Sequence, residues 1–542
     1  MKKLMLGNEA VARGLYEAGV SVVSSYPGTP STEITEYAST YPEIYSEWAP
    51  NEKVAVEAAL GASIAGRRSF SGMKHVGLNV AADPLFTSSY TGVNGGVVIA
   101  VADDPGMHSS QNEQDSRHYA RAAKIPMLEP SDSAECLRMA KLAYELSERY
   151  DTPVLLRLTT RVAHSRSVCE TGEREERAVI PYKKDVMKYV MMPAMARGRH
   201  VKAEERMKEL GGFAETFAGN TVEINNAGIG IITSGISYQY AKEALGVNAN
   251  YLKLGMVWPL PVKLIKDFAA AAGKIYVIEE LDDFLETHCR KYGVPVIGKE
   301  LFPVCGELSQ AIVREKLLGE TKPHFVYPEP IPARPPVFCP GCSHRGVFQA
   351  LKDLDVYISG DIGCYSIGAT APYHAMDSVI CMGASVSGLH GYNKALGSDG
   401  EKKAVAVIGD STFIHSGITG LIDIVYNQSN SVVIILDNSI TGMTGHQENP
   451  STGYNIHGDP TAAINMEALC KALSIDHVRV VDPYKKNELY DAVKEELAYE
   501  GPSVIIVRRP CILIKNKARK NRPSDAVPVN ADRNTDSARE GA

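Results

Sequence analysis

Two aliphatic runs of the sequence each end in residues that carry oxygen. After the run 404–408 come Gly409, Asp410, Ser411 and Thr412, and after the run 431–436 come Asp437 and Asn438. Because ligands of α/β sheets bind beyond the carboxyl ends of parallel strands, the 28 positions between Asp410 and Asn438 can return both side chains to one edge. Together with the backbone carbonyl of Ile440, they provide oxygen ligands for Mg²⁺, whose remaining ligands can be phosphate oxygens. The same residues can also simply form turns after strands, so both interpretations stay open.

Four of the ten cysteines are spaced as ligands of a metal or cluster. Cys339 and Cys342 form a C-x-x-C motif, Cys364 follows 22 positions later, and Cys511 comes just after the aliphatic run 503–507. Converging thiolates can hold zinc or an iron–sulfur cluster, and spacing alone does not separate the two. Alternatively, Cys364 and Cys511 are small buried hydrophobic residues. We expect structural roles for the six that stand singly, which are Cys136, Cys169, Cys289, Cys305, Cys381 and Cys470.

The N-terminal part of the chain contributes an acid and several candidates for binding an anion. Glu52 opens a helix-like run in which Glu57 is its competitor, and the ordinary location for either is an exposed helix surface. Thr29 follows a predicted strand, where its hydroxyl suits a substrate carboxylate, although the same turn is typical of a helix N-terminus. Lys74 and His75 can pair with the same anion, although a single histidine more often has a structural role.

The elements that must position these residues follow from the pattern of the whole chain. Aliphatic runs alternate with amphipathic stretches, which indicates α/β domains with parallel sheets. A charged, methionine-rich stretch follows the first block, and seven prolines between residues 323 and 340 predict an extended connector after the second. The C-terminal end is polar, and we expect it to be disordered. The predicted segments are a first block 1–180, a linker with helical pieces 181–225, a second block 226–325, a connector 326–336, a third block 337–514 and a tail 515–542.

Composition excludes several classes of protein. Hydrophobic residues make up 44% of the 542 residues and charged residues 22%, which are ordinary values for globular domains. The net charge of -7 provides no basic field for a nucleic-acid backbone, so we expect no nucleic-acid partner. The longest apolar stretches, such as 95–102, are far shorter than the roughly 20 residues that cross a bilayer. The N-terminus also lacks the pattern of a signal peptide, so we expect a cytoplasmic protein with no membrane partner.

Several longer motifs resemble one known family. The Gly-Asp and Asn spacing, with 442–447 close behind, resembles the thiamine diphosphate signature of 2-oxoacid:ferredoxin oxidoreductases. Within that superfamily, the chain resembles the large (alpha) subunit of indolepyruvate ferredoxin oxidoreductase from residue 1 to about residue 514. The segments that carry this resemblance are 51–62, 73–84, 109–117 and 339–346.

The resemblance implies a fold and a role for each candidate residue. The first block would be a pyrimidine-binding domain, the second a transketolase C-terminal-like domain, and the third a diphosphate- and magnesium-binding domain. Glu52 would activate the cofactor, and Thr29 and His75 would contact substrate. Mg²⁺ would be held by Asp410, Asn438 and Ile440. Thiamine diphosphate would be held by these and by Gly409, Ser411, Thr412, Gly442, Met443 and Thr444. A 4Fe-4S cluster would be held by Cys339, Cys342, Cys364 and Cys511.

The activity implied is the oxidative decarboxylation of aryl 2-oxoacids to acyl-coenzyme A, with electrons passing through the cluster to ferredoxin. Coenzyme A would be a co-substrate, and a small beta subunit would complete the enzyme. The sequence departs from the family in one respect, because the C-terminal ferredoxin-like segment with further cysteine motifs is not found after Cys511. This departure keeps open a non-redox thiamine diphosphate-dependent 2-oxoacid decarboxylase or carboligase, and also a catalytically silent assembly or regulatory subunit.

Overall fold

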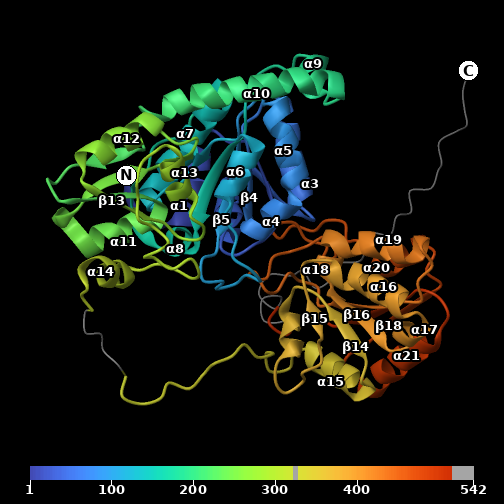
Figure 1. Cartoon of the computed structure of the whole chain (residues 1–542). Coiled ribbons are helices and arrows are strands. Elements are labelled where there is room, and N and C mark those ends of the chain that lie inside the picture. Colours follow the sequence, from blue (N-terminus) through green and yellow to red (C-terminus); the bar gives the residue numbers. More distant parts are fainter. Residues whose placement is uncertain (322–326, 515–542) are drawn as a thin grey trace, which may run out of the picture. The chain divides into compact units, whose positions relative to one another are not determined.

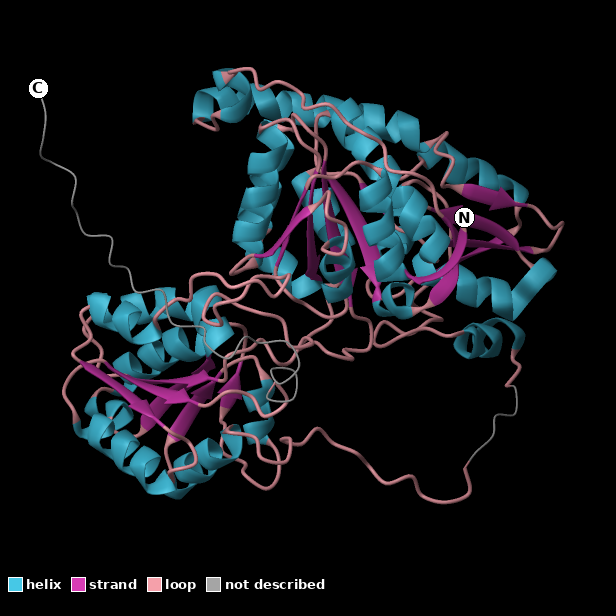
Figure 2. Ribbon diagram, turned by 180° about the vertical axis from the view of Figure 1, so that it is seen from behind, coloured by secondary structure: helices cyan, strands magenta, loops and turns pink. Residues whose placement is uncertain are grey.

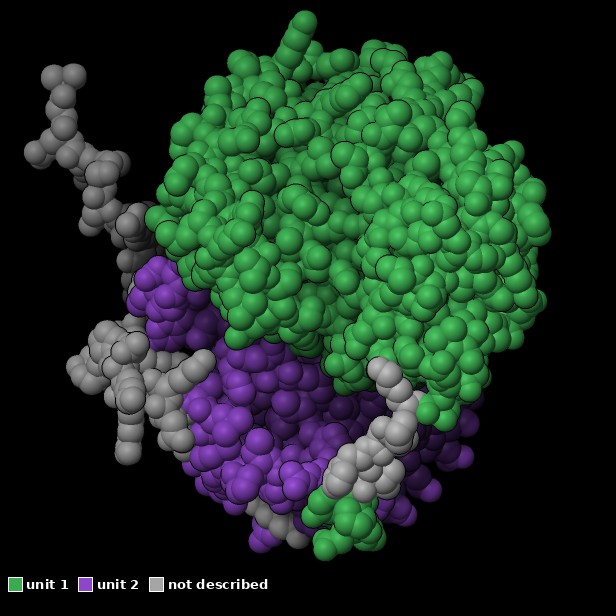
Figure 3. Space-filling model, turned by 90° about the vertical axis from the view of Figure 1, so that its left-hand side faces the viewer, with its two compact units in different colours: residues 1–333 green, residues 334–542 purple. Residues whose placement is uncertain are grey.

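The computed structural model describes residues 1–321 and 327–514, apart from the side chain of Lys486. The chain forms two compact units, residues 1–333 and 334–542, which Figure 3 colours separately. The tail expected at 515–542 lies outside the described residues, and residues 327–339 form neither helix nor strand. In the described part of the chain, no helix has both the length and the apolar character needed to span a membrane.

The first unit is built around a seven-stranded sheet. In spatial order its strands are β12 (Met256–Trp258), β6 (Met127–Leu128), β7 (Val154–Thr159), β5 (Val97–Asp103), β4 (Ser69–Lys74), β2 (Val22–Ser25) and β3 (Tyr45–Trp48). Neighbouring strands are parallel except for β12, which runs antiparallel to β6. Every residue of β5 is buried, as expected for a parallel strand covered on both faces.

Helices cover both faces of this sheet (Figure 1). One layer consists of α1 (Gly7–Glu17), α2 (Thr32–Ala38) and α7 (Ser133–Tyr150). The other consists of α3 (Glu52–Ile64), α4 (His75–Val80), α5 (Ala82–Thr91) and α6 (Arg117–Ala123). Successive residues of β5 point to opposite faces, so Val98, Ala100 and Ala102 belong to the first core and Val97, Ile99 and Val101 to the second.

A smaller sheet completes the first unit. Its order is β13 (Lys274–Ile278), β10 (Ile229–Ser234), β11 (Asn250–Leu254) and β9 (Thr221–Glu223), with β9 antiparallel to its neighbour. Its helices are α11 (Gly235–Leu245), α12 (Val262–Ala271), α13 (Phe284–Lys291) and α14 (Gln310–Leu318). The segment expected to be a linker contains α9 (Val186–Tyr189) and the 22-residue α10 (Pro193–Ala214). Two further strands, β1 (Lys2–Leu6) and β8 (Arg166–Glu170), pair antiparallel, and α8 (Thr160–His164) lies between β7 and β8 in the chain.

The second unit has one fully parallel six-stranded sheet with helices on both faces (Figure 2). Its order is β15 (Ser378–Val379), β14 (Tyr357–Gly360), β16 (Ala404–Gly409), β17 (Val432–Asp437), β19 (Ser503–Arg508) and β18 (His477–Val481). One face packs on α15 (His344–Leu354) and α21 (Lys486–Ala498). The other packs on α16 (Ala384–Leu396), α19 (Ile418–Tyr426) and α20 (Met466–Ala472). Short helical turns include α18 (Asp410–Thr412) and a π-turn at Phe413–Gly417.

Candidate functional site

In the second unit, the two oxygen-bearing segments meet at one edge of the sheet. β16 ends at Gly409 and β17 ends at Asp437, and the parallel register pairs Gly409 with Leu436. Asp410 and Asn438 therefore both leave the sheet at its carboxyl edge, where α/β folds bind ligands. The strand–helix–strand interval predicted from their spacing is confirmed.

Asp410 is a buried acid, with only 2% of its surface exposed. One carboxylate oxygen accepts hydrogen bonds from the Ser451 hydroxyl at 3.2 Å and from the Asn449 amide at 3.5 Å. Burial, together with the negative charge of Asp437, raises the pKa of Asp410 to about 7. Among the described residues, no basic side chain forms an ion pair with Asp410. A divalent cation beside this carboxylate would offset both the cost of its burial and its repulsion by Asp437. The residue therefore fits the predicted magnesium site.

The loop after β17 folds back toward Asp410. Asn438 accepts a hydrogen bond from the backbone N–H of Ile440 through its side-chain oxygen, at 3.2 Å. Further along, the hydroxyl of Thr441 donates to the hydroxyl oxygen of Ser411 at 3.0 Å. Thr441 also forms a β-bridge with Gln447, which closes the loop. Gly442, Met443 and Thr444 lie within this closed loop, and the Met443 side chain is exposed.

The hydroxyl of Thr412, which was predicted to contact the diphosphate, already donates a hydrogen bond within the protein. The Thr412 hydroxyl donates to the backbone carbonyl of Ile362 at 3.0 Å. A hydroxyl that donates its hydrogen there cannot donate it to a phosphate at the same time. The Thr412 hydroxyl is therefore not available to a phosphate while this hydrogen bond is kept.

Sequence reasoning missed a second acid at the same edge. Asp361 follows β14, and its carboxylate accepts from the backbone N–H groups of Gly383 at 3.0 Å and Ser385 at 2.9 Å, at the start of α16. Burial raises the pKa of Asp361. The Ser385 hydroxyl is buried beside this carboxylate and helps to hold it. The pair Gly360 and Asp361 repeats the strand–Gly–Asp pattern of Gly409 and Asp410, and this repeat was the available signal.

The structure brings together the four cysteines selected from the sequence. Burial raises the pKa of the Cys364 thiol to about 11, with further increases from Cys342, Cys511 and Cys339. These thiols are therefore close enough to interact electrostatically. In the described chain, however, no three of their sulfur atoms lie within 4.8 Å of one another.

The cysteines contact the same loop that carries Asn438. The backbone N–H of Cys511 donates to the carbonyl of Asn438 at 2.9 Å. A Cβ atom added at Gly442 would lie 3.4 Å from the sulfur of Cys364, so the loop passes directly over that thiol. The candidate magnesium ligand and the cysteine group therefore share one loop.

In the first unit, Glu52 occupies the first position of α3. Asn51 caps the helix by accepting from the N–H of Val54 at 2.9 Å. Glu52 is only 4% exposed, and Gly77 of α4 packs against it so closely that an added Cβ would lie 2.5 Å from one carboxylate oxygen. Glu57, in contrast, is exposed and pairs with Lys53. Of the two candidates, only Glu52 is a buried, fixed carboxyl group.

Thr29, Lys74 and His75 lie at the carboxyl edge of the first sheet and contact one loop. The Lys74 ammonium donates to the carbonyl of Ser109 at 2.8 Å, and the Ser109 hydroxyl donates to the carbonyl of Thr29 at 3.4 Å. The Nε2 atom of His75 lies 3.1 Å from the carbonyl oxygen of Asn112. The structure therefore joins Thr29 to Lys74 through Ser109 and places His75 on the same loop.

A buried network of ion pairs anchors the base of this loop. Arg117 pairs with Asp115 at 2.5 Å and with Glu279, which follows strand β13 of the smaller sheet, at 2.6 Å. Arg157 of β7 pairs with Asp103 at 2.7 Å and with Glu129 at 2.6 Å. Next to Asp103, Asp104 accepts from the N–H of Ser109 at 2.8 Å and from the hydroxyls of Ser110 and Thr160, both at 2.7 Å. The loop that reaches Lys74 is thus held by fixed charges rather than by packing alone.

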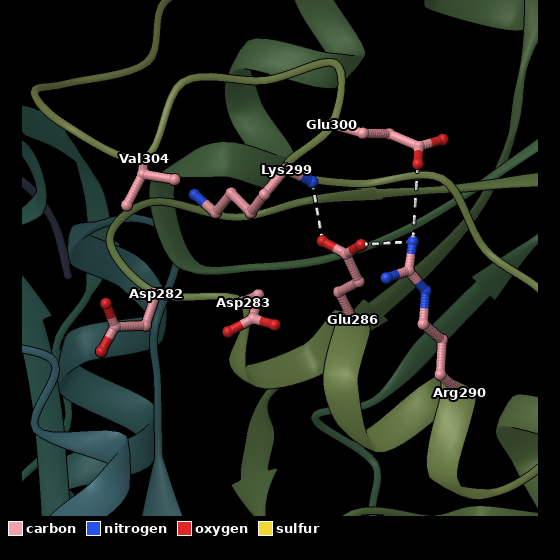
Figure 4. A pocket seen from close by; sticks show the side chains of 7 residues that line it. All are labelled: Asp282, Asp283, Glu286, Arg290, Lys299, Glu300 and Val304. Atoms are coloured by element: carbon pink, nitrogen blue, oxygen red, sulfur yellow. Dashed lines mark hydrogen bonds and ion pairs between the residues drawn. The ribbon is translucent and has the colours of Figure 1, made fainter.

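A polar cavity of about 260 Å³ lies farther along the first unit (Figure 4). Its walls are formed by Asp282, Asp283, Glu286, Arg290, Lys299, Glu300 and Val304. Glu286 pairs with Arg290 at 2.7 Å and accepts from the backbone N–H of Lys299 at 2.6 Å. Arg290 also lies 3.8 Å from Glu300. Glu286, Arg290 and Glu300 thus pair with one another at this cavity, and the Lys299 ammonium donates to the backbone carbonyl of Glu279.

Two family models match the chain. Residues 13–209 match pyruvate flavodoxin/ferredoxin oxidoreductase, thiamine diphosphate-binding. Residues 361–507 match thiamine pyrophosphate enzyme, C-terminal TPP binding domain. The chain is also 41% identical to indolepyruvate oxidoreductase subunit IorA of Archaeoglobus fulgidus, covering 96% of this chain and 88% of that one. The chain belongs to the IorA family. A second IorA, from Pyrococcus horikoshii, is 40% identical over 95% of this chain and 86% of its own length.

The fold of this IorA-family chain also resembles a solved structure. The 2-oxoglutarate:ferredoxin oxidoreductase from Magnetococcus marinus superposes with a TM-score of 0.50 at 20% identity, covering 59% of this chain and 65% of that chain. At this identity the likeness shows the fold alone. The predicted α/β class with thiamine diphosphate-binding domains is confirmed by the parallel sheets and by the two family models.

Proposed function

We propose that this chain is the large subunit of an enzyme that oxidatively decarboxylates aryl 2-oxoacids to acyl-coenzyme A. Thiamine diphosphate, Mg²⁺ and a 4Fe-4S cluster would be its cofactors, ferredoxin its electron acceptor and a small beta subunit its partner. The relatives named indolepyruvate oxidoreductase support the substrate class, and their designation as a subunit supports the partner.

Each group of site residues has a task in this proposal. Thiamine diphosphate supplies a nucleophilic carbon and holds the electrons that remain when carbon dioxide leaves. Glu52, which the Asn51 cap and the contact with Gly77 hold in position, would hydrogen-bond the pyrimidine ring of the cofactor. Asp410, Asn438 and the carbonyl of Ile440 would hold Mg²⁺, and the turn of Gly409 and Ser411 would bind the diphosphate.

The observation that carries the redox part of the proposal is the contact between the cysteine group and the cofactor loop. Cys511 binds the Asn438 carbonyl, and Cys364 lies under Gly442. A cluster held by Cys339, Cys342, Cys364 and Cys511 would therefore adjoin the site where electrons are released. A non-redox decarboxylase or carboligase has no use for four thiols in that place, which makes it the second candidate.

The test is anaerobic purification of the chain with its small subunit, followed by analysis of iron and acid-labile sulfide. We expect about four iron atoms per chain, as a 4Fe-4S cluster requires, and reduction of methyl viologen that depends on coenzyme A and on indolepyruvate or phenylpyruvate. Glu52→Gln should abolish the reduction, whereas Glu57→Gln is the matched control and should retain it. Iron-free protein that still decarboxylates 2-oxoacids would support the second candidate instead.

A further inference from the structure

Lys74 is a partly buried ammonium whose charge is not matched by a carboxylate in contact. It is the last residue of β4, and the stem of its side chain lies against Gly28, where an added Cβ would be 3.3 Å from its Cγ. Its nitrogen uses one donor on the Ser109 carbonyl. No acidic side chain in the described ranges forms an ion pair with it. An ammonium has three donors, so the structure leaves unused capacity at this point.

The surroundings of Lys74 suit a negatively charged ligand. Burial lowers the pKa of Lys74, and the charges of Asp104 and Glu52 only partly offset this. Asp104 is itself occupied by Ser109, Ser110 and Thr160, so it is not a direct partner. An anion brought into contact would relieve the cost of burying the ammonium.

The histidine next to Lys74 in the chain has one ring nitrogen without a partner among the described residues. His75 is 1% exposed, and its Nε2 atom faces Asn112. Its Nδ1 atom is buried with no hydrogen-bond partner among the described residues. A bound ligand or an ordered water molecule is an ordinary partner for a buried nitrogen of this kind.

This pair lies close to the acid assigned to the cofactor. The charge of Glu52 acts on Lys74, and Gly77, two residues after His75, touches the Glu52 carboxylate. A ligand bound by Lys74 would therefore lie in the neighbourhood of Glu52. The 2-oxoacid is the anion that the proposed reaction brings to the cofactor, so its carboxylate is the candidate ligand at this position.

Resting on the proposed function, we infer that Lys74 binds the carboxylate of the 2-oxoacid and that His75 offers a second hydrogen bond to the same end of the substrate. Lys74 is thereby the residue that selects 2-oxoacids over neutral carbonyl compounds. Its contact is made to the group that leaves as carbon dioxide, so it contributes to binding more than to the chemical step.

The test compares Lys74→Met with the wild type in the complex of both subunits, using phenylpyruvate as substrate and viologen reduction as the assay. Loss of one hydrogen bond to a charged group should raise KM for phenylpyruvate about 10- to 100-fold, with kcat within about threefold. Lys74→Arg keeps the charge and should recover part of this loss. Lys208→Met, on the exposed side of α10, is the matched control and should leave KM unchanged.

Two further measurements separate this role from a structural one. Calorimetric titration of phenylpyruvate without thiamine diphosphate should show the same loss of affinity in Lys74→Met. The melting temperature should not fall, because a buried ammonium without a paired carboxylate is replaced by an apolar chain of similar length. An unchanged KM for phenylpyruvate would overturn the inference, as would a raised KM for coenzyme A alone, since the ammonium would then bind a phosphate. Wild-type protein that oxidises no 2-oxoacid would instead refute the proposed function.

Discussion

Replacing Asp410 by asparagine should make the metal-free protein more stable and at the same time abolish its response to magnesium and thiamine diphosphate. The carboxylate is buried near Asp437 and has no cation partner among the described side chains, so its charge is costly until a cation arrives. Asparagine keeps the size and one oxygen but removes the charge. A residue that served only the fold would give the opposite result.

The magnitude follows from the pKa of Asp410. Burial raises it from 3.8 to about 7, and one pH unit corresponds to about 1.36 kcal/mol. The folded chain keeps the proton up to about pH 7, whereas the unfolded chain releases it near pH 4. The free energy of unfolding therefore falls as the pH rises between these values. Above pH 7 the charged form costs about 4 kcal/mol, and Asp410→Asn should recover up to that amount.

Scanning calorimetry of the full chain at pH 8 in EDTA provides the assay. A gain of about 4 kcal/mol should raise the transition of the second unit by roughly 8–16 °C, and the gain should vanish near pH 4. Magnesium with thiamine diphosphate should raise the same transition in the wild type but not in the variant. Asp399→Asn, an exposed site, is the control. A variant no more stable than the wild type in EDTA, or one still stabilised by the cofactor, would refute the reasoning.

Three other substitutions test separate parts of the structure. Gly77→Ala places a methyl group where it must displace the Glu52 carboxylate. Viologen reduction should therefore fall about 100-fold, without a loss of melting temperature. Full activity of this variant would contradict the role given to Glu52. Cys364→Ser should lower the iron content well below that of the wild type, while Cys305→Ser, at an exposed cysteine, should not; equal iron in both would exclude Cys364 as a ligand. Burial is the main cause that raises the pKa of Glu280 to about 7. Glu280→Gln should therefore stabilise the first unit by about 3 kcal/mol at pH 8 and hardly at all near pH 4.5. A gain in stability that does not depend on pH would argue against the buried charge as its cause.

The residues at the carboxyl edges of the sheets could be predicted, because the end of each buried strand and the parallel direction of its neighbours fix where the following residues lie. A buried run that ends in Gly409 and Asp410, followed after one helix by another that ends in Asp437, places the acids at one edge whatever the loops do. The burial of Glu52 needed more than periodicity. The sequence offered Glu57 as a competitor that only the resemblance disfavoured, whereas the structure shows Glu52 buried against Gly77 and Glu57 exposed beside Lys53.

Contacts made by loops were not predictable in the same way. Asn449 and Ser451 reach Asp410 from an irregular segment with no period that would orient their side chains. The pairing of β12 with β6 also has no signal in the sequence, since β12 is a three-residue strand that joins a sheet formed mostly by residues more than 100 positions earlier. The environment of Lys74 was equally hard to predict, because it depends on the absence of a carboxylate in contact with its ammonium among the described residues.

The pairing of Arg117 with Glu279 limits how such genes can recombine. Arg117 is the first residue of α6 on the first sheet and is almost fully enclosed, whereas Glu279 follows β13 in the smaller sheet. Glu280 and Asp282 add two backbone carbonyls to the same guanidinium. A fragment ending before residue 226 would expose an arginine that has lost three of its partners, and a transplanted second block would need an acid at the matching position. An exchange of either sheet between relatives would therefore have to keep this buried pair of arginine and carboxylate.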